Sequence, residues 1–241
     1  MNIKFIGTGT MGSTTRANTS ILVDNILLDC GMGTVKQLER LGKQIKDLDY
    51  IAITHFHPDH FFDIPNALHG RKIRKENNKV LNIIVPVGGR NTIVKLMDLA
   101  FEDMGSNENI EENFNVKFIE LSANETYSFE DYKIATIELK HGNCNPVYGY
   151  LLTKGNATIG YTGDTYICDN FFRMCEQANC MFADATTLVS AKKEVHISFE
   201  ELKEFAEKYS NCKFYAVHRS DYEIQDKGKV NVPSDGEEIK L

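Results

Sequence analysis

Four side chains that can bind a metal ion stand within six positions in the first quarter of the chain. The segment Thr54-His55-Phe56-His57-Pro58-Asp59-His60 holds three of the seven histidines in 241 residues. Neutral imidazole and carboxylate are the ligands that zinc and similar divalent ions prefer. At the end of a strand, His55 and His57 point the same way, whereas Asp59 and His60 lie where the chain turns into a helix. The spacing therefore predicts two adjacent metal ions.

A site for two ions needs further ligands, ideally including a carboxylate that can bridge both ions. His141, Asp164 and His218 are the best-placed residues, because each follows a strand-like apolar run. Strand ends would bring them to one edge of the sheets. Each residue taken alone also fits a loop histidine or a turn aspartate. Together with the first segment, they favour one shared site.

The elements that must position these residues alternate between strand and helix patterns. Strand-like segments occur at 2–6, 20–23, 26–28, 50–53, 81–87, 115–121, within 126–162, at 180–183 and at 213–217. Helical spacing occurs near 35–41, 60–75, 91–104, 169–179 and 199–209. We expect a mixed α/β (α+β) class with two sheets and helices outside, in a single domain over residues 1–220. Residues 221–241 are polar with few apolar anchors, which predicts a loosely held C-terminal tail.

Composition is that of a globular protein, with 42% hydrophobic and 25% charged residues. No apolar run is long enough to span a bilayer, and the chain opens on a strand-like segment, so we expect a cytoplasmic protein without a membrane partner. The six cysteines form no C-x-x-C pair, which favours reduced thiols buried as small hydrophobic residues. Cys144, three residues after His141, is the one thiol for which we weigh a catalytic role.

Charge is distributed unevenly along this chain of net charge -7. A basic cluster, formed by Arg71, Lys72, Arg74, Lys75 and Lys79, follows the metal-binding segment. Such a cluster can steer an anionic substrate or a nucleic acid toward the site. A solvated helix end explains it equally well.

Several short motifs carry a family resemblance that spans residues 3 to about 220. The chain resembles metallo-β-lactamase-fold hydrolases, and within them the ribonuclease Z branch. The matching segments are His55-x-His57-x-Asp59-His60, His141 with Gly149-Tyr150, Thr162-Gly163-Asp164-Thr165, Ala183-Asp184-Ala185-Thr186, His196-Ile197-Ser198 and Val217-His218-Arg219-Ser220.

The resemblance implies a four-layer αββα sandwich with the site along one edge of its two sheets. It also implies how the ligands divide between two divalent ions, for which we expect zinc, with manganese or iron as alternatives. The implied sets are His55, His57 and His141 for one ion, Asp59, His60 and His218 for the other, and Asp164 as the bridge. The resemblance implies a homodimer as well.

The expected activity is that of a binuclear metal-dependent hydrolase, a phosphodiesterase in which a metal-bound hydroxide attacks an anionic phosphoester. Two divalent ions, two carboxylates and a hydroxide leave about one positive charge, which suits a phosphodiester. Asp59 can orient the attacking hydroxide. His196 is a histidine that the metals do not consume, and it can protonate the leaving oxygen. By the resemblance, Asp184 would orient His196, at a position where the family usually has glutamate.

The substrate is expected to be a small or unstructured anionic phosphoester. Ribonuclease Z enzymes usually carry a long basic arm between the segments that match Gly149-Tyr150 and Gly163-Asp164-Thr165, whereas only residues 151–161 lie between them here. Processing of tRNA 3′ ends, as in a ribonuclease Z endonuclease, is therefore an alternative. Hydrolysis of lactones or thioesters is another alternative, and a non-catalytic metal or ligand sensor is a third.

Overall fold

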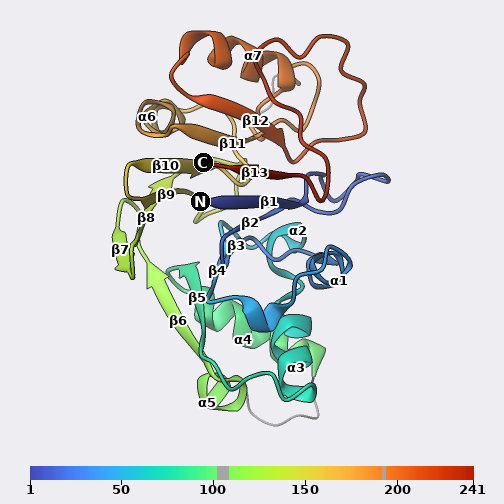
Figure 1. Cartoon of the computed structure of the whole chain (residues 1–241), viewed down its shortest axis with the longest axis vertical. Helices are drawn as coiled ribbons and strands as arrows, with labels where there is room; N and C mark the ends of the chain where they lie inside the picture. Colours follow the sequence, from blue (N-terminus) through green and yellow to red (C-terminus); the bar gives the residue numbers. More distant parts are fainter. Residues whose placement is uncertain (102–108, 192–193) are drawn as a thin grey trace.

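The computed structural model describes residues 1–101, 109–191 and 194–241, and its strands form two sheets (Figure 1). The first sheet has the order β13-β1-β2-β3-β4-β5-β6, with bounds β1 Asn2–Gly7, β2 Ser20–Val23, β3 Ile26–Leu28, β4 Tyr50–Ala52, β5 Leu81–Pro86, β6 Val116–Leu121 and β13 Glu238–Lys240. The second has the order β12-β11-β10-β9-β8-β7, with bounds β7 Thr126–Phe129, β8 Tyr132–Glu138, β9 Tyr148–Lys154, β10 Ala157–Tyr161, β11 Cys180–Asp184 and β12 Lys213–Val217.

Helices cover the outer face of each sheet (Figure 1). Those over the first sheet are α1 Thr34–Arg40, the 3-10 helix η1 Ile45–Asp47, α2 Pro58–Phe61, α3 Ile64–Ile73, α4 Gly89–Ala100 and α5 Ile110–Phe114. Those over the second sheet are α6 Asp169–Gln177 and α7 Phe199–Lys208. Among the described residues, no helix has the length and apolar character that crossing a membrane requires.

Three apolar cores separate these layers. One core lies between the sheets and contains residues of both, such as Phe5 and Phe182, whose rings meet edge to face at 5.4 Å. The second lies between the first sheet and its helices, and the third between the second sheet, α6 and α7. Because each sheet buries side chains on both faces, a four-layer αββα sandwich results. The expected fold class is confirmed.

The directions of the strands bring the carboxyl ends of several of them to the same edge of the second sheet. In the second sheet, β10, β11 and β12 are parallel neighbours. Strand β8 runs in the same direction as β10, because both are antiparallel to β9. Strands β3 to β6 of the first sheet are also parallel. The loops that follow β8, β10, β11 and β12 therefore leave the second sheet at the same edge.

One predicted helix is two helices in the structure. The pattern over 60–75 predicts continuous helix, but α2 ends at Phe61 and α3 begins at Ile64. Pro65 lies in the first turn of α3, where its missing N–H costs nothing, whereas the interior of a long helix would lose a hydrogen bond there. The predicted helix at 91–104 corresponds to α4, and its last residues, 102–104, lie outside the described residues.

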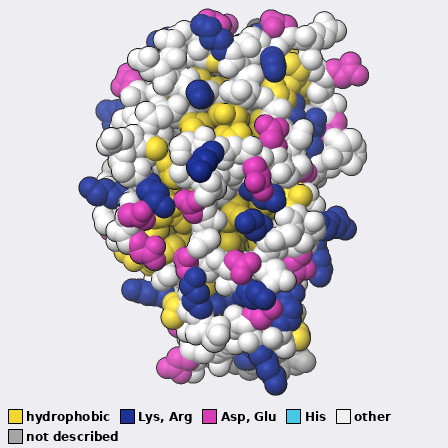
Figure 2. Space-filling model, in the orientation of Figure 1, with side chains coloured by type: hydrophobic (Ala, Val, Ile, Leu, Met, Phe, Trp, Pro, Cys, Tyr) yellow, Lys and Arg dark blue, Asp and Glu magenta, His cyan; other side chains and the backbone are white. Residues whose placement is uncertain are grey.

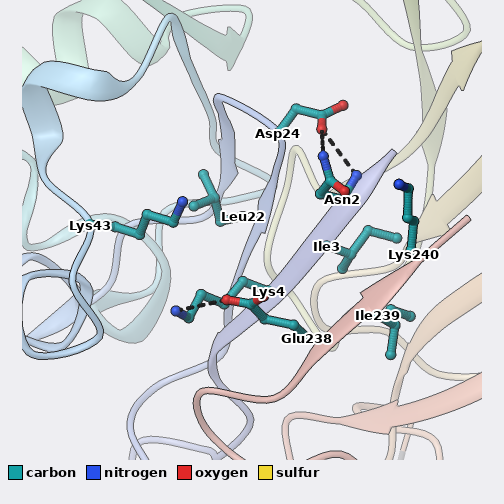
Figure 3. Close-up of a pocket in the computed structure, with 9 residues that line it drawn as sticks. All are labelled: Asn2, Ile3, Lys4, Leu22, Asp24, Lys43, Glu238, Ile239 and Lys240. Carbon is teal, nitrogen blue, oxygen red and sulfur yellow. Dashed lines mark hydrogen bonds and ion pairs between the residues drawn. The ribbon is translucent and has the colours of Figure 1, made fainter.

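The C-terminal segment corrects our expectation of a loosely held tail. Strand β13 pairs with β1 in antiparallel register, and Lys4 bonds Glu238 at 3.0 Å (Figure 3). Val230 is buried against the core beneath α7. Backbone pairing, polar contacts and apolar residues that pack on the two cores hold this segment; the apolar residues are Tyr222, Ile224, Val230, Val232, Ile239 and Leu241. The division of the chain into a domain over 1–220 and a separate tail stays a prediction.

Candidate metal centre

All seven sequence-predicted ligands lie at the common edge of the two sheets. The segment with His55 and His57 follows β4, and Asp59 and His60 occupy the single turn of α2. Pro58 is the first residue of this helix, and its fixed backbone angle favours a helix start directly after the extended His57. The other three residues follow strands of the second sheet. They are His141 after β8, Asp164 after β10 and His218 after β12.

The first group of ligand atoms surrounds one point. His55, His57, His141 and Asp164 each offer one ligand atom, and these atoms lie within 4.8 Å of one another. His141 Nε2 is 3.2 Å from His57 Nδ1 and 3.6 Å from Asp164 Oδ2. His55 Nε2 is 3.9 Å from the same oxygen. Three imidazole nitrogens and a carboxylate oxygen are thus close enough to bind one cation.

A second group lies beside the first and shares Asp164 with it. Asp59, His60, Asp164 and His218 also offer ligand atoms within 4.8 Å of one another. Asp164 Oδ1 is 3.1 Å from His60 Nε2 and 3.2 Å from His218 Nε2, and His218 Nε2 is 3.2 Å from Asp59 Oδ2. The two oxygens of Asp164 therefore face different groups, as a bridging carboxylate would.

Buried polar atoms without a hydrogen-bond partner show that these ligand groups fit divalent cations. His55 Nε2, His60 Nε2 and Asp164 Oδ1 are buried and have no hydrogen-bond partner. Buried polar atoms without a partner are costly. These three atoms belong to the two groups above, and nitrogen and oxygen ligands suit zinc, manganese and iron. Cations bound here would satisfy all three atoms.

Hydrogen bonds at the opposite ring nitrogens aim four of the histidines at the centre. Nδ1 of His60 donates to Asp29 Oδ2 at 2.7 Å, and Nδ1 of His141 donates to the Val195 carbonyl at 2.7 Å. Nδ1 of His55 lies 3.1 Å from Thr54 Oγ1, and Nδ1 of His218 lies 2.9 Å from Thr186 Oγ1. Each contact leaves Nε2 free as a ligand, which is the usual arrangement around protein-bound metals.

Asp29 belongs to the candidate site, and the sequence analysis does not identify it. It is buried directly after β3, with a positive φ of 60°. Besides His60, it accepts hydrogen bonds from the Thr54 backbone at 2.8 Å and from the Tyr161 hydroxyl at 2.8 Å. Its position after an apolar strand is the same signal that pointed to Asp164. The sequence does not reveal that Asp29 hydrogen-bonds the candidate metal ligand His60 instead of binding a metal itself.

Asp29→Asn is expected to weaken metal affinity about 10- to 100-fold, the usual loss when the partner of a ligating histidine is removed. The amide cannot accept from His60 with the strength of a carboxylate, so the ring loses its fixed orientation. Competition with a chromogenic chelator measures the affinity, and far-UV circular dichroism verifies folding. Asp131→Asn, at an exposed turn, is the matched control. Equal affinities of the two variants would refute the orienting role.

The charged states of the ligands follow from burial and from their neighbours. Burial acts to raise the pKa of Asp164, but His218 and His60 outweigh it and hold that pKa well below its ordinary value. Burial also acts to raise the pKa of Asp59, but the hydrogen bond with His218 outweighs burial and the pKa is lowered. Burial lowers the pKa of His55 and of His57. Ionised carboxylates and neutral imidazoles are the forms that bind metals.

His196 and Asp184 form a pair beside the cluster. Nδ1 of His196 donates to Asp184 Oδ2 at 2.7 Å, so the aspartate side chain is long enough to reach the ring. Asp184 is buried at the end of β11 and also accepts from the backbone of Thr165 and Thr186 at 3.0 Å each. Burial acts to lower the pKa of His196, but Asp184 outweighs it and raises the pKa to about 9. The His196 ring is 4.8 Å from that of His141.

A further combination of ligand atoms includes this pair. Asp164, Asp184, His196 and His218 offer atoms within 4.8 Å of one another. Asp184 already accepts hydrogen bonds from the backbone of Thr165, from Thr186 and from His196 Nδ1. We therefore assign these two residues to proton chemistry rather than to metal binding, which stays a prediction.

The cluster opens into a cavity of about 380 Å³. Among the described residues, those that line its wall include no lysine and no arginine. Beyond the histidines and aspartates, it is formed by Thr10, Met11, Gly12, Pro58, Thr186 and Val195. Another cavity, of about 300 Å³, lies beside β1 and β13 (Figure 3), and its lining contains neither histidine nor cysteine. The first cavity is therefore the candidate site.

The basic cluster does not serve this cavity. None of its five residues lines the cavity, and four of them contact nearby groups. These contacts are Arg71 to the Lys79 carbonyl, Lys72 to the Phe114 ring, Arg74 to Glu39 and Glu76, and Lys79 to Asp49. Basic and acidic side chains are interspersed on the face drawn in Figure 2. The arrangement fits the alternative of a solvated helix end better than that of a steering patch.

Cys144 lies near the cluster, but it does not resemble a nucleophile. Its backbone N–H bonds the His141 carbonyl at 2.9 Å. Burial raises the pKa of the Cys144 thiol, and Asp164 adds to this effect. A thiol with a raised pKa holds little of the reactive thiolate at neutral pH. All six cysteines are free, as expected.

The two sheets between helical layers, with this cluster at their edge, define a metallo-β-lactamase-fold protein. The chain superposes on the metallo-β-lactamase fold protein YhfI of Bacillus subtilis with a TM-score of 0.77 and 17% identity, covering 99% of this chain and 98% of that one. It superposes on the short form of human tRNase Z with a TM-score of 0.79 and 22% identity, covering 100% and 99%.

Sequence comparison gives the family. A family model described as anti-Pycsar protein Apyc1 matches residues 1–233, and the chain belongs to that family. It is 29% identical to ribonuclease Z of Staphylococcus carnosus over 158 residues, which cover 62% of this chain and 48% of that protein. The chain thus spans about half the length of the first curated relatives it matches. Ribonuclease Z of Pyrococcus abyssi is 25% identical over 275 residues, covering 91% and 86%.

Proposed function

We propose that this protein is a metal-dependent phosphodiesterase that hydrolyses a small anionic phosphodiester in the cavity at the sheet edge. The observation that carries the proposal is the pair of ligand groups joined by the two oxygens of Asp164, with His196 beside them. Relatives named ribonuclease Z support a phosphodiester substrate. Hydrolysis of lactones or thioesters does not require an acid such as His196 in this position.

Two divalent cations, zinc in the first place, would be held by the two groups. When bound, they lower the pKa of water, hold phosphoryl oxygens and offset the charge that grows on the leaving oxygen. The proposed ligands are His55, His57, His141 and Asp164 for one ion, and Asp59, His60, Asp164 and His218 for the other.

The remaining groups move and direct protons. His196 lines the cavity, and its Nε2 makes no hydrogen bond to another described residue. Asp184 fixes the ring through Nδ1 and favours its protonated form, so Nε2 can give a proton to the departing alkoxide. Asp59 has one oxygen near His218, and its carboxylate lines the cavity, where it can orient the attacking water.

The residues that line the cavity favour a small substrate. Binding to a nucleic-acid backbone draws much of its strength from lysine and arginine, and the described residues of the wall include neither. Strands β9 and β10 are joined by a two-residue turn after Lys154, so the interval in which ribonuclease Z enzymes usually carry a basic arm holds a short hairpin here. A small phosphodiester needs no such grip. Cleavage of precursor tRNA, supported by the names of the relatives, is the second candidate.

A substrate panel tests the proposal. The metal-loaded protein would be assayed with bis-p-nitrophenyl phosphate, cyclic nucleotides, precursor tRNA, a lactone and a thioester. We expect turnover of the small phosphodiesters, with precursor tRNA cleaved slowly or not at all. Turnover of only the lactone or thioester would overturn the proposal, and preference for precursor tRNA would favour the second candidate. The cytoplasmic location and the homodimer expected from the sequence stay predictions.

Removing metal is expected to abolish turnover and also to destabilise the fold. A ligand that binds only the native state at 100 times its Kd stabilises it by ~2.7 kcal/mol. For a chain of this size, that corresponds to a fall in Tm of about 5–10 °C after chelation. Differential scanning calorimetry with and without chelator measures the shift, and added zinc should reverse it. An unchanged Tm would show that no resident metal stabilises the fold.

A further inference from the structure

The loop between β1 and β2, residues 8–19, forms one side of the metal cavity. Its tip, Thr10 to Gly12, lines that cavity, and the Met11 side chain is 55% exposed there. The tip is a turn, in which the Ser13 N–H donates to the Thr10 carbonyl at 3.1 Å. The backbone N–H groups of Met11 and Gly12 make no hydrogen bond to another described residue. The tip therefore offers a ligand two free donors and one apolar side chain.

Packing fixes only the first residue of the tip. Thr10 is buried, whereas Met11, Gly12, Thr14 and Thr15 are exposed and Ser13 is half-buried. An exposed loop that buries little apolar surface is ordinarily mobile, because nothing offsets its conformational entropy. A fixed conformation here has to come from polar contacts.

For the stretch directly after the tip, those contacts come from one carboxylate far away in the sequence. Asp221 accepts five hydrogen bonds from four consecutive loop residues. The donors are Ser13 Oγ at 2.6 Å, the Thr14 N–H at 2.6 Å, Thr14 Oγ1 at 2.9 Å, Thr15 Oγ1 at 2.8 Å and Arg16 Nη1 at 2.8 Å. Hydrogen bonds to an ionised acceptor are about twice as strong as neutral ones. Asp221 thus gathers the stretch directly after the tip around a single charge.

A second aspartate holds the base of the same loop. Asp235 accepts from the Thr8 N–H at 2.9 Å, from Thr8 Oγ1 at 2.8 Å and from the Ala17 N–H at 2.7 Å. Between the two aspartates, the Arg219 backbone bonds Thr8 at 3.0 Å and Thr10 at 3.2 Å. The ligand His218 immediately precedes Arg219. The loop is therefore tied to the strand end that carries a candidate metal ligand.

We propose that Asp221 is a positioning residue for substrate binding, which acts by holding the Thr10–Gly12 tip against the mouth of the metal cavity. The inference rests on the proposed function. The described residues of the cavity wall include no lysine and no arginine, and the tip supplies backbone donors and an apolar contact to the part of the substrate that lies away from the cations. Asp221 itself does not line the cavity.

The absence of tryptophan from the chain allows a direct test. Met11→Trp places a single fluorophore at the exposed tip, and its anisotropy reports the mobility of the loop without any turnover. Bis-p-nitrophenyl phosphate quenches a nearby indole, so quenching reports whether the probe docks beside position 11. Asp221→Ala is compared in this background with Asp226→Ala, another exposed aspartate of the same segment, which contacts Lys203 and not the loop.

We expect Asp221→Ala to lower the anisotropy and to raise the quenching midpoint about five- to tenfold, with metal content unchanged. In the parent sequence the same change should raise KM by a similar factor and change kcat less than about twofold, the signature of lost uniform binding. Asp221→Glu, which keeps a carboxylate, should recover part of the loss. Asp226→Ala should match the parent in every measurement.

Two results would overturn the positioning role. One is an unchanged anisotropy and quenching midpoint in Asp221→Ala. The other is an equal loss of fold and metal in Asp221→Ala and Asp221→Glu, which would assign Asp221 a purely structural role. If the probe docks but no phosphodiester turns over, the proposed function fails while the effect of Asp221 on docking can still be read.

Discussion

Asp164→Asn is expected to lower phosphodiester turnover about 10³-fold or more, because Asp164 as the proposed bridging ligand would serve both cations, and loss of the cations would remove several kcal/mol of transition-state stabilisation. Its two oxygens face different ligand groups, at 3.1 Å from His60 Nε2 and 3.6 Å from His141 Nε2. The amide offers one oxygen and no charge, so one group loses its shared ligand. Metal content by inductively coupled plasma mass spectrometry should fall together with turnover.

The matched control is Asp131→Asn, which makes the same chemical change at an exposed turn where the side chain forms an ion pair with Lys154. It should keep full metal content and full turnover. If Asp164→Asn retained two equivalents of metal and wild-type activity, the shared-ligand arrangement would be wrong. A loss of turnover with metal retained would instead limit Asp164 to a role in the chemistry.

His196→Ala is expected to reduce turnover about 10²- to 10⁴-fold, the usual contribution of a general acid, while metal content stays unchanged. The ring is held by Asp184 and lies beside the cluster, 4.8 Å from His141 and 5.4 Å from His218 between ring centroids. The measurement is kcat for a series of phosphodiesters whose leaving groups differ in pKa. The loss should be largest for poor leaving groups, which need the proton, and small for p-nitrophenolate, which does not.

His69→Ala is the control histidine. His69 lies in α3, outside the cavity wall, and its ring stacks on Phe101 at 4.3 Å. It should leave turnover unchanged across the whole series. A loss in His196→Ala that is equal for good and poor leaving groups would remove the acid role and leave only a positional one. Full activity of His196→Ala on a substrate with a poor leaving group would exclude both the acid role and the positional role of His196.

Elements whose pattern is local were predicted well. Strand β12 at Lys213–Val217 matches its predicted bounds, and α7 begins at Phe199, as the helical spacing over 199–209 predicted, with a capping box of Ser198 and Glu201 at its start. Both depend on neighbours within a few residues. The break between α2 and α3 was missed although Pro65 signalled it. A helical pattern of apolar residues continues across the break, and such a pattern does not show where backbone hydrogen bonds stop.

The C-terminal segment shows the opposite case. Its composition predicted a loose tail, yet Asp235 bonds Thr8 and Ala17, and β13 closes the edge of the first sheet. A carboxylate looks the same in a sequence whether it meets water or the backbone of a loop more than 200 residues away. Contacts of this kind have no local signature, so no reading of residues 221–241 by themselves could reveal them.

The order of amino acids determined which side chains could bind metal and that each stands at the end of a strand or in the turn of α2. The early histidine segment, Asp164 and His218 were identifiable on that basis alone. Only the tertiary structure decided that these ends meet, because strand direction and pairing are set by contacts between distant segments. It also decided that the two oxygens of Asp164 face different groups and that Asp29 hydrogen-bonds His60. Ligand chemistry belongs to single residues, whereas distance and direction belong to the fold.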